Sequence, residues 1–179
     1  MKMTSDPTED AADIVALFQM TFTRSEGAEV GASIAGLVSD MLAQVAASDI
    51  LVLSAHEGDR LIGAVIFTRM DYPQDPRQVF ILSPMAVAPD RQGQGVGLAL
   101  LQEGLARLRA RGVDVVLTYG DIGFYGRGGF APVPQECAAA PLPLTYLEGW
   151  LGQDLTGSGP VTLTGPSRCV APLEKPEFW

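Results

Sequence analysis

The sequence predicts a layered α/β fold, and three patterns along the chain support this prediction. Two segments with apolar residues at helical spacing come first, two short apolar runs joined by turn residues follow, and the middle then reads strand, turn, helix, strand. The last pattern is typical of a crossover that lays a helix on a sheet. With 179 residues, 47% of them hydrophobic, the chain is expected to form one domain with a core rather than two.

The two leading segments are predicted to be helices over residues 9–23 and 31–46. The first places these apolar residues on one face: Ile14, Leu17, Phe18 and Phe22. The second has a similar stripe: Ile34, Leu37, Val38, Met41, Leu42 and Val45. Gly27 and Gly31 lie between the two stripes, and we expect both of them to loosen the join.

Strands are predicted over residues 50–55, 61–70, 79–87 and 113–119. Turn residues 56–60 separate the first two, which favours a hairpin. Pro84 interrupts the third strand, and because proline cannot donate to a ladder, it marks a bulge or an unpaired position. The helix before the last strand ends near Arg111, where Gly112 is a suitable C-cap.

The segment beyond Ala131 differs in composition from the rest of the chain, since it holds eight of the 13 prolines. Long helices are therefore not expected there. We expect short strands and turns that close over an edge of the sheet, with a short helix near residues 146–151. The predicted organisation is a main domain over residues 1–133 and a Pro/Gly-rich extension over residues 134–179 that packs on the same domain.

Charge and composition exclude several classes of function. The chain has 21 acidic and 12 basic residues and a formal net charge of −9, which argues against nucleic acid and against anionic lipid as partners. The same balance permits a cationic substrate. No apolar run is long enough for a membrane span, and the N-terminus lacks a signal-peptide pattern, so a cytoplasmic location is expected. Cys137 and Cys169 are too few for a disulfide scaffold, and no metal site is expected.

The most informative segment runs from Arg91 to Leu98, between a predicted strand and a predicted helix. Its glycines at 93, 95 and 97 remove side chains where backbone N–H groups must approach a ligand closely. The start of a helix adds unpaired donors and a partial positive charge, so the segment predicts a site for phosphate or pyrophosphate. A turn without a ligand is a poor alternative, because each glycine in a first helical turn costs about 1 kcal/mol relative to alanine.

Two other phosphate-binding motifs do not fit this spacing. A dinucleotide fingerprint requires a third glycine where this chain has Leu98. A P-loop requires a lysine after its last glycine, and the chain's lysines are Lys2 and Lys175. Arg91 is compatible either with a contact to a phosphate or with a solvated charge.

Two motifs in this order carry a family resemblance. In residues 82–97, Gln92, Gly95 and Gly97 follow a strand with a predicted bulge. In residues 120–130, Tyr125 is followed, after three other residues, by Gly129 and Phe130. Together they resemble the acyl-CoA-binding motif and the Tyr-x-x-x-Gly-Phe element of the GNAT superfamily of N-acetyltransferases. The resemblance covers residues 8–133 and points to a bacterial subgroup of predicted N-acetyltransferases.

The resemblance implies a fold and a co-substrate. The fold is a mixed, mostly antiparallel central sheet with a splayed strand pair and flanking helices, and residues 1–133 form a GNAT-like acetyl-CoA-binding domain. Acetyl-CoA is the implied co-substrate, with its pantetheine arm bonded to the main chain of Met85 and Val87. Its pyrophosphate is then held by consecutive residues of the glycine segment: Gln92, Gly93, Gln94, Gly95, Val96, Gly97 and Leu98.

The implied reaction is acetyl transfer to a primary amine by direct attack on the thioester. The N–H of Val87 is expected to stabilise the developing oxyanion. Tyr125 matches the family's general acid, since a phenol is protonated at pH 7 and can donate to a thiolate; the alternative is an aromatic that only packs beside the coenzyme. The acceptor is a small-molecule amine or a protein amino group, and a homodimer is compatible with the family.

No general base is identifiable, although several residues are candidates. Glu26 and Glu29 lie where the family often builds its acceptor site, yet both are typical of solvated surface charges. His56 has a suitable pKa, but its turn context favours an exposed position. Asp121 follows a strand end and favours a role in the turn, and Trp150 either packs in the tail or lines the acceptor pocket.

Two further hypotheses remain open beside the enzyme. One is a non-catalytic acyl-CoA-binding module that regulates a partner, against which Tyr125 is weak evidence. The other is a nucleotide-binding α/β protein, which would prefer a dinucleotide to coenzyme A. An enzyme would release CoA from acetyl-CoA in the presence of an amine, whereas a binding module would not. A nucleotide-binding protein would bind a dinucleotide in preference to acetyl-CoA.

Overall fold

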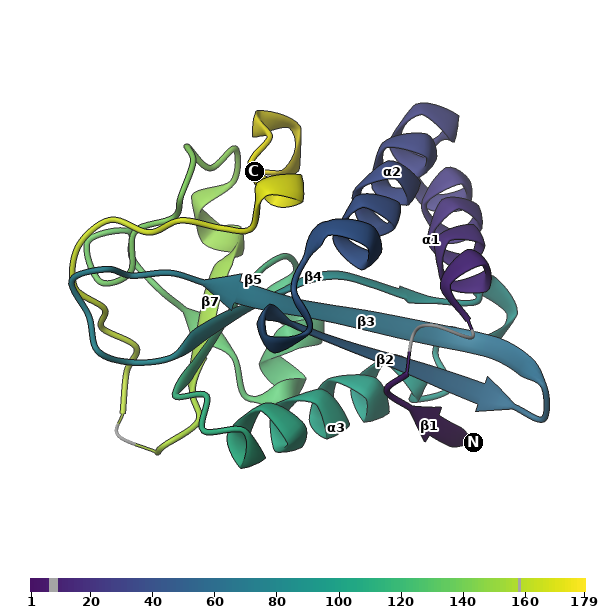
Figure 1. The fold of residues 1–179 in the computed structure, drawn as a ribbon, viewed down its shortest axis with the longest axis horizontal. Coiled ribbons are helices and arrows are strands. Elements are labelled where there is room, and N and C mark those ends of the chain that lie inside the picture. The colour runs from purple at the N-terminus through teal and green to yellow at the C-terminus, as the bar shows by residue number, and fades with distance from the viewer. Residues whose placement is uncertain (7–9, 158) are drawn as a thin grey trace. The chain divides into compact units, whose positions relative to one another are not determined.

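A computed structural model describes residues 1–6, 10–157 and 159–179 (Figure 1). In the described part, hydrogen bonds join the strands in the order β1-β2-β3-β4-β5-β7-β6. The strands are β1 (Lys2–Thr4), β2 (Ile50–Glu57), β3 (Arg60–Met70), β4 (Val79–Val87), β5 (Val115–Tyr119), β6 (Ala131–Pro132) and β7 (Trp150–Asp154). The α-helices are α1 (Ala11–Glu26), α2 (Ala28–Gln44), α3 (Val96–Ala110) and α4 (Ile122–Tyr125). The predicted α/β fold, with a mixed, mostly antiparallel sheet and flanking helices, is confirmed.

The predicted helices are present, but the join between the first two is shorter than expected. Helix α1 runs to Glu26 and α2 begins at Ala28, while Glu9, where the first helix was predicted to begin, lies outside the described residues. Gly27 alone forms the join, with a φ of 99° that favours glycine. The expectation that Gly31 also loosens the join is wrong, because Gly31 lies inside α2 and is buried.

The chain divides into two compact units, residues 1–67 with 84–104, and residues 68–83 with 105–179. The predicted division at residue 133 stays a prediction, as does a homodimer.

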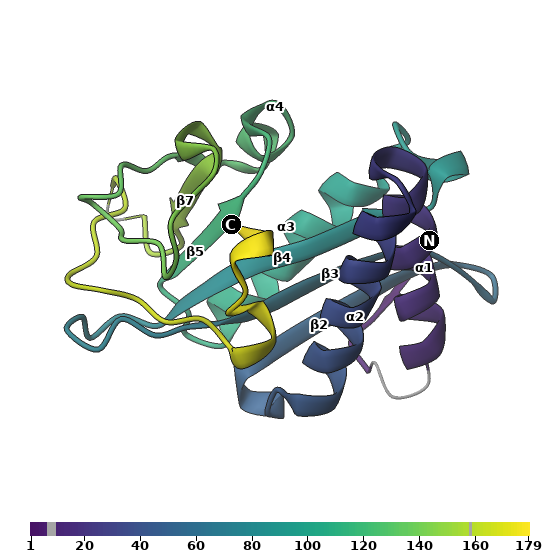
Figure 2. The same cartoon turned by 90° about the horizontal axis from the view of Figure 1, so that it is seen from above.

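In the first unit α1 and α2 lie side by side over β2 and β3 (Figure 2). Most of the predicted apolar stripes are at most 5% exposed: Ile14, Leu17, Phe18, Leu37, Val38 and Met41. These side chains form the core under the helix pair.

Close packing also fixes α3 against β3 in the first unit. A Cβ added at Gly63 would lie 2.9 Å from the Leu100 side chain and 3.0 Å from that of Val96. One added at Gly104 would overlap the ring of Phe67. Because a side chain at either glycine would push the helix away, these two positions hold α3 close to the strand. The first turn of α3, which follows the glycine segment, is thereby held in place.

In the second unit, β4 and β5 form a parallel ladder that runs from Val79–Val115 to Leu82–Thr118 and ends there. The Thr118 hydroxyl donates to the Leu82 carbonyl at 3.1 Å, at the last rung. Pro84 follows soon after on β4 and has no N–H to donate. Strand β4 continues beyond this last rung to Val87, whereas β5 ends at Tyr119.

The tail contributes more to the sheet than the sequence indicated. Short strands and turns are confirmed, and residues 147–149 form a single 3₁₀ turn. However, β7 does not merely cover an edge, because it pairs antiparallel with β5 from Val115–Asp154 to Tyr119–Trp150. Strand β6 then pairs with β7 on its other side. The tail therefore supplies a strand inside the sheet.

Buried polar contacts hold this tail in place. The indole N–H of Trp150, which is fully buried, donates to the Ala138 carbonyl at 2.8 Å. The carboxylate of Asp75 is almost fully buried, and it accepts hydrogen bonds from Arg77 and from the Thr164 N–H. The Arg77 guanidinium, more than any other group, holds the pKa of Asp75 well below its ordinary value. The buried carboxylate of Asp75 is tolerated because Arg77 and the Thr164 N–H donate hydrogen bonds to its oxygens.

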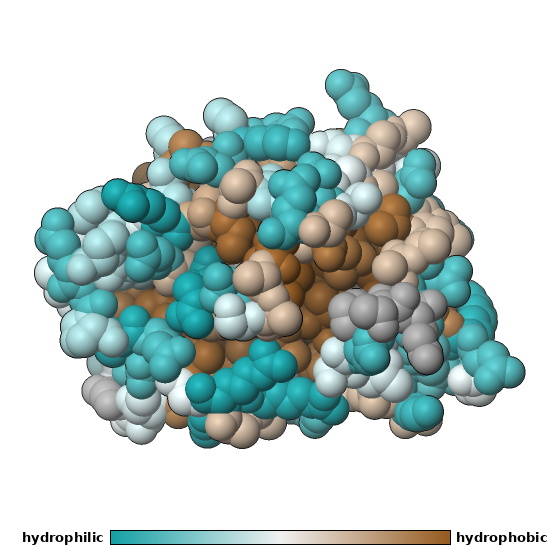
Figure 3. All heavy atoms as spheres, in the orientation of Figure 1, coloured by the Kyte–Doolittle hydropathy of each residue, from teal (hydrophilic) through white to brown (hydrophobic). Residues whose placement is uncertain are grey.

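Hydrophilic side chains spread over much of the face drawn in Figure 3, with apolar side chains gathered among them. Apolar area of this kind is ordinary on a protein surface. Within the part of the chain that the structure describes, no helix is long and apolar enough to cross a membrane.

The contact between α1 and α2 predicts opposite effects of two glycine substitutions in α2. A Cβ at Gly31 would overlap the Thr23 hydroxyl and lie 2.9 Å from the Gln19 carbonyl oxygen, whereas Gly36 has nothing within 4 Å. Gly31→Ala should lower the free energy of unfolding by about 1–2 kcal/mol through overpacking. Gly36→Ala should raise it by about 0.5–1 kcal/mol through helix propensity. Urea denaturation measures both, and equal effects of the two variants would show that the helices do not touch at Gly31.

Candidate active site

The glycine segment forms a left-handed turn between β4 and α3. Gly93 has a φ of 73° and Gly95 a φ of 86°, values that residues with a side chain rarely adopt. A Cβ at either position would meet nothing within 4 Å, so the turn is open on its outer side. The Gly95 carbonyl accepts the N–H of Ala99 at 3.0 Å, which starts the hydrogen bonding of the helix. The N–H groups of residues 96–98 therefore lie in the first helical turn, where no carbonyl of the helix can reach them.

Two glutamine side chains brace this turn from within. The amide of Gln92 donates to the Val87 carbonyl at 3.0 Å, and that of Gln94 donates to the Asp90 carbonyl at 3.0 Å. Residues 92–95 are otherwise exposed. The side chains thus fix the backbone, and the main chain is left as the surface that a ligand meets.

Ion pairs attach the segment before the turn to the β2–β3 hairpin. Arg60 donates to both carboxylate oxygens of Asp90, at 2.8 and 2.7 Å. Arg91 contacts Glu57 at 2.5 Å and Asp90 at 2.9 Å. Of the two roles left open for Arg91, a solvated charge does not describe its paired guanidinium, and a phosphate contact stays a prediction. The Arg60 hydrogen bonds lower the pKa of Asp90 to about 2.

The residues predicted to contact coenzyme A follow one another along the first unit. Met85 and Val87 lie on β4 and are half-buried, while their neighbours Pro84, Ala86 and Ala88 are buried. This alternation gives β4 one partly open face. A 3₁₀ turn at Pro89–Arg91 follows the strand, and the predicted pyrophosphate residues 92–98 come after that turn.

Tyr125 belongs to the second unit and ends the short helix α4. Its ring lies edge-on to Phe124, at 5.1 Å between centroids, and to Phe130, at 5.8 Å. A Cβ at Gly120 would lie only 2.6 Å from this ring, so a glycine at that position makes room for it. Burial raises the pKa of Tyr125, and a hydrogen bond with Thr118 opposes the rise. The phenol is therefore protonated throughout the neutral range, as a proton donor must be.

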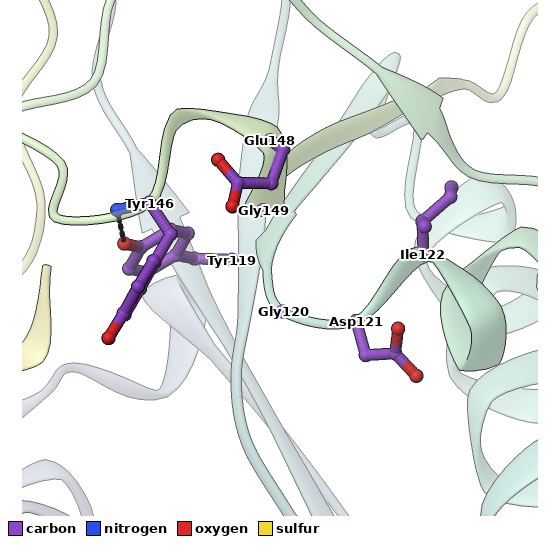
Figure 4. A pocket seen from close by; sticks show the side chains of 7 residues that line it. All are labelled: Tyr119, Gly120, Asp121, Ile122, Tyr146, Glu148 and Gly149. Atoms are coloured by element: carbon purple, nitrogen blue, oxygen red, sulfur yellow. Dashed lines mark hydrogen bonds between the residues drawn. The ribbon is translucent and has the colours of Figure 1, made fainter.

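The second unit also contains a pocket of about 350 Å³ that the sequence did not predict (Figure 4). It lies between the end of β5 and the segment before β7. Its lining is Tyr119, Gly120, Asp121, Ile122, Tyr146, Glu148 and Gly149. The aromatic and acidic run from Tyr146 to Trp150 is the signal in the sequence, and it predicts only a short helix.

The other residues considered for the general base or the acceptor site lie in different parts of the fold. His56 does not lie in an exposed turn: it is in β2, mostly buried, with Nε2 3.1 Å from Asp10. Asp121 accepts the Gly123 N–H at 3.0 Å and so caps α4, in agreement with a role in the turn. Trp150 packs in the core and does not line the pocket above. Glu26 is exposed, and Glu29 is exposed as well.

No group of three or more histidine, cysteine or acidic side chains that could hold a metal occurs among the described residues. Cys137 and Cys169 are both free thiols and half-buried. The mixed sheet and flanking helices define an α/β protein. Main-chain N–H groups at the start of α3 are of the kind that favours an anion.

Comparison with known proteins identifies the family. Residues 47–132 match the family described as the acetyltransferase (GNAT) domain. The Escherichia coli K12 protein YjhQ, an uncharacterized N-acetyltransferase, is 35% identical over 170 residues, which cover 92% of this chain and 90% of YjhQ. A GNAT family acetyltransferase from Brucella melitensis in complex with acetyl-CoA has a TM-score of 0.75 at 25% identity, covering 97% of both chains. Escherichia coli YhbS, solved in complex with CoA, has a TM-score of 0.79 at 24% identity, covering 97% of this chain and 92% of YhbS, and shows the same fold.

The chain belongs to the GNAT family and is an N-acetyltransferase. Membership identifies acetyl-CoA as its co-substrate, as the family resemblance implied. The roles of the individual site residues are proposals that rest on the geometry of the turn, β4 and Tyr125.

The ion pairs at the glycine turn predict an acid titration. Because the folded-state pKa of Asp90 is depressed to about 2, its stabilising effect is present above the ordinary carboxyl pKa of 3.8 and is lost as the pH falls through about 2. Carboxyl-resolved NMR should record the Asp90 midpoint near 2. Arg60→Gln should raise that midpoint toward 3.8, since it removes the largest cause of the shift.

The matched control is Arg24→Gln, which removes an exposed arginine of α1. It should leave the titration of Asp90 unchanged. An Asp90 midpoint that stays the same in Arg60→Gln would mean that the hairpin does not hold this segment.

Proposed function

We propose that this enzyme transfers the acetyl group of acetyl-CoA to a primary amine by direct attack of the neutral amine on the thioester carbonyl. The observation that carries the proposal is the glycine turn, with positive φ at Gly93 and Gly95 and no side chain on its outer side. Main-chain N–H groups at such a turn, together with the helix N-terminus, favour a diphosphate. Residues 92–98 are the proposed diphosphate site.

The pantetheine arm and the carbonyl are proposed to use main-chain groups of β4. Met85 and Val87 lie on its partly open face, where main-chain groups can pair with an extended ligand as with an added strand. The N–H of Val87 is the proposed donor to the oxyanion that forms when the amine attacks. The Gln92 amide holds the Val87 carbonyl, which fixes the orientation of this residue.

The bonds and protons balance with Tyr125 as the acid. The new bond joins the amine nitrogen to the acetyl carbon, and the carbon–sulfur bond breaks. The departing thiolate takes the phenolic proton of Tyr125. The nitrogen that formed the new bond then carries one proton too many and releases it to solvent, from which the phenolate recovers a proton. The attacking amine must first lose a proton, since an alkylammonium has a pKa near 10.4. A chain of water molecules can carry that proton away, because no single side chain is assigned as the base.

Binding of coenzyme A should depend on the left-handed backbone at Gly95. Gly95→Ala forces a side chain into a conformation that costs about 1–3 kcal/mol, so CoA affinity should fall by about tenfold or more. Gly112→Ala is the matched control, because Gly112 has a φ of 79° but lies beyond the C-terminus of α3. It should lose stability without losing affinity. Isothermal titration calorimetry measures both; an unaltered dissociation constant in Gly95→Ala would exclude the turn as the diphosphate site.

Removal of the Tyr125 hydroxyl should slow the chemical step. Tyr125→Phe is expected to lower kcat about 10²–10⁴-fold, with little change in the KM for acetyl-CoA, because it removes the proton donor and keeps the ring. The raised pKa also predicts that activity climbs with pH as the amine deprotonates and does not fall again below pH 10. Release of free CoA thiol, followed with an amine panel, is the measurement.

Tyr72→Phe serves as the control for loss of a tyrosine hydroxyl. That hydroxyl donates to the Ala139 carbonyl at 2.8 Å and lies outside the proposed site. The variant should lower stability and keep kcat. Acetyl-CoA binding without turnover of any amine would instead support a non-catalytic module.

A further inference from the structure

We propose that the acceptor is a primary ammonium compound with an apolar or aromatic stem, bound in the pocket at the end of β5, with Glu148 as the partner of its charge. This inference rests on the proposed transfer to a primary amine and adds the class of amine. The pocket's volume of about 350 Å³ lies within the range of small-ligand sites.

The floor of the pocket is rigid. The Tyr119 hydroxyl accepts the Tyr146 N–H at 2.6 Å, drawn as a dashed line in Figure 4. On another side the Tyr119 ring stacks on Trp179, with 6.4 Å between centroids and 14° between planes. Gly149 fits beneath the ring only because it lacks a Cβ, which would lie 3.0 Å from it. A ring held by three contacts gives a ligand a fixed aromatic surface.

The rim of the pocket is unusually apolar for exposed residues. Ile122 is 43% exposed, Tyr146 64% and Leu147 65%. These are three of the five large hydrophobic residues that are exposed in the described part of the chain. Ile122 and Tyr146 line the pocket, and Leu147 directly follows Tyr146. Apolar side chains gathered around one hollow are typical of a surface that a ligand covers.

The charges in the pocket select a cation. Its lining contains two carboxylates and no lysine or arginine. Figure 4 shows the Glu148 carboxylate on the side of the Tyr119 and Tyr146 rings, whereas that of Asp121 points away from them. Asp121 is also engaged as the cap of α4. An ammonium beside Glu148 gains both a charge pair and contact with the tyrosine faces, and an anion gains neither.

The pocket adjoins the proposed acid through Gly120. This glycine lines the pocket, and the same residue makes room for the Tyr125 ring on its other side. Its N–H is fixed by the Gly149 carbonyl at 2.9 Å, so the backbone between pocket and acid is held at both ends. Gly120 therefore separates an amine bound here from the ring of the proposed acid, Tyr125.

Glu148 is thus a specificity-determining residue rather than a base. A carboxylate beside an ammonium stabilises the charged form, which favours binding and does not promote deprotonation. Its loss should therefore appear in the KM for the amine and not in kcat. A base would show the opposite pattern.

The experiment compares 2-phenylethylamine with 2-phenylethanol, which has the same stem and no charge, on the full chain saturated with CoA. Ligand-observed NMR measures binding, and thiol release with acetyl-CoA measures turnover. Nα-acetyl-lysine amide is a third ligand that reports whether a protein lysine satisfies the same site. Glu148→Gln should raise the KM and dissociation constant of 2-phenylethylamine about 3- to 5-fold, as for an exposed ion pair, and leave the KM of acetyl-CoA unchanged.

Two further variants complete the test. Tyr146→Ala should weaken both phenyl ligands, because it removes the apolar wall. Glu136→Gln, an exposed glutamate outside the pocket lining, should change none of these values. Equal binding of the amine and the alcohol, or of the amine to wild type and Glu148→Gln, would overturn the inference. Binding of 2-phenylethylamine that depends on Glu148, without turnover of any amine, would support the cation pocket and reject the transferase mechanism.

Discussion

The structure depends on one backbone constraint, the left-handed turn that converts β4 into α3. Gly93 and Gly95 adopt positive φ, and this reversal is what presents the first N–H groups of α3 to a ligand. The helix that follows is held against β3 where Gly63 and Gly104 permit close approach. Packing thus fixes the helix, backbone conformation fixes the turn before it, and the proposed anion site lies where the two meet.

The sequence predicted those parts of the molecule that depend on local interactions. The apolar stripes of α1 and α2, the interruption at Pro84 and the glycine turn each follow from residues close together in the chain. Helix periodicity and turn chemistry are local properties, so the order of the helices and strands could be predicted, whereas the diphosphate site stays a prediction. The proposed acid, Tyr125, came instead from resemblance to a family.

Features that depend on distant residues were missed. His56 is partly enclosed because it meets Asp10, and no local pattern around residue 56 indicates that partner. Strand β7 enters the sheet through a register with β5 that joins segments more than 30 residues apart. The pocket at Tyr119 needs Tyr146 and Glu148 from beyond a proline-rich segment, so single-sequence periodicity could not bring its walls together.

An acidic protein that takes a polyanionic co-substrate must bind phosphate without relying on net positive charge. The chain carries a formal charge of −9, and Arg91, the arginine nearest the turn, is already paired with Glu57 and Asp90. In the proposed site, main-chain N–H groups and the helix dipole resolve the conflict, because they attract an anion while adding no unit charge. The arginines then pair with carboxylates beside the turn, and Glu148 is the proposed partner of a cationic acceptor. The same acidic surface that does not favour nucleic acid is thus compatible with both substrates of an acetyl transfer to an amine.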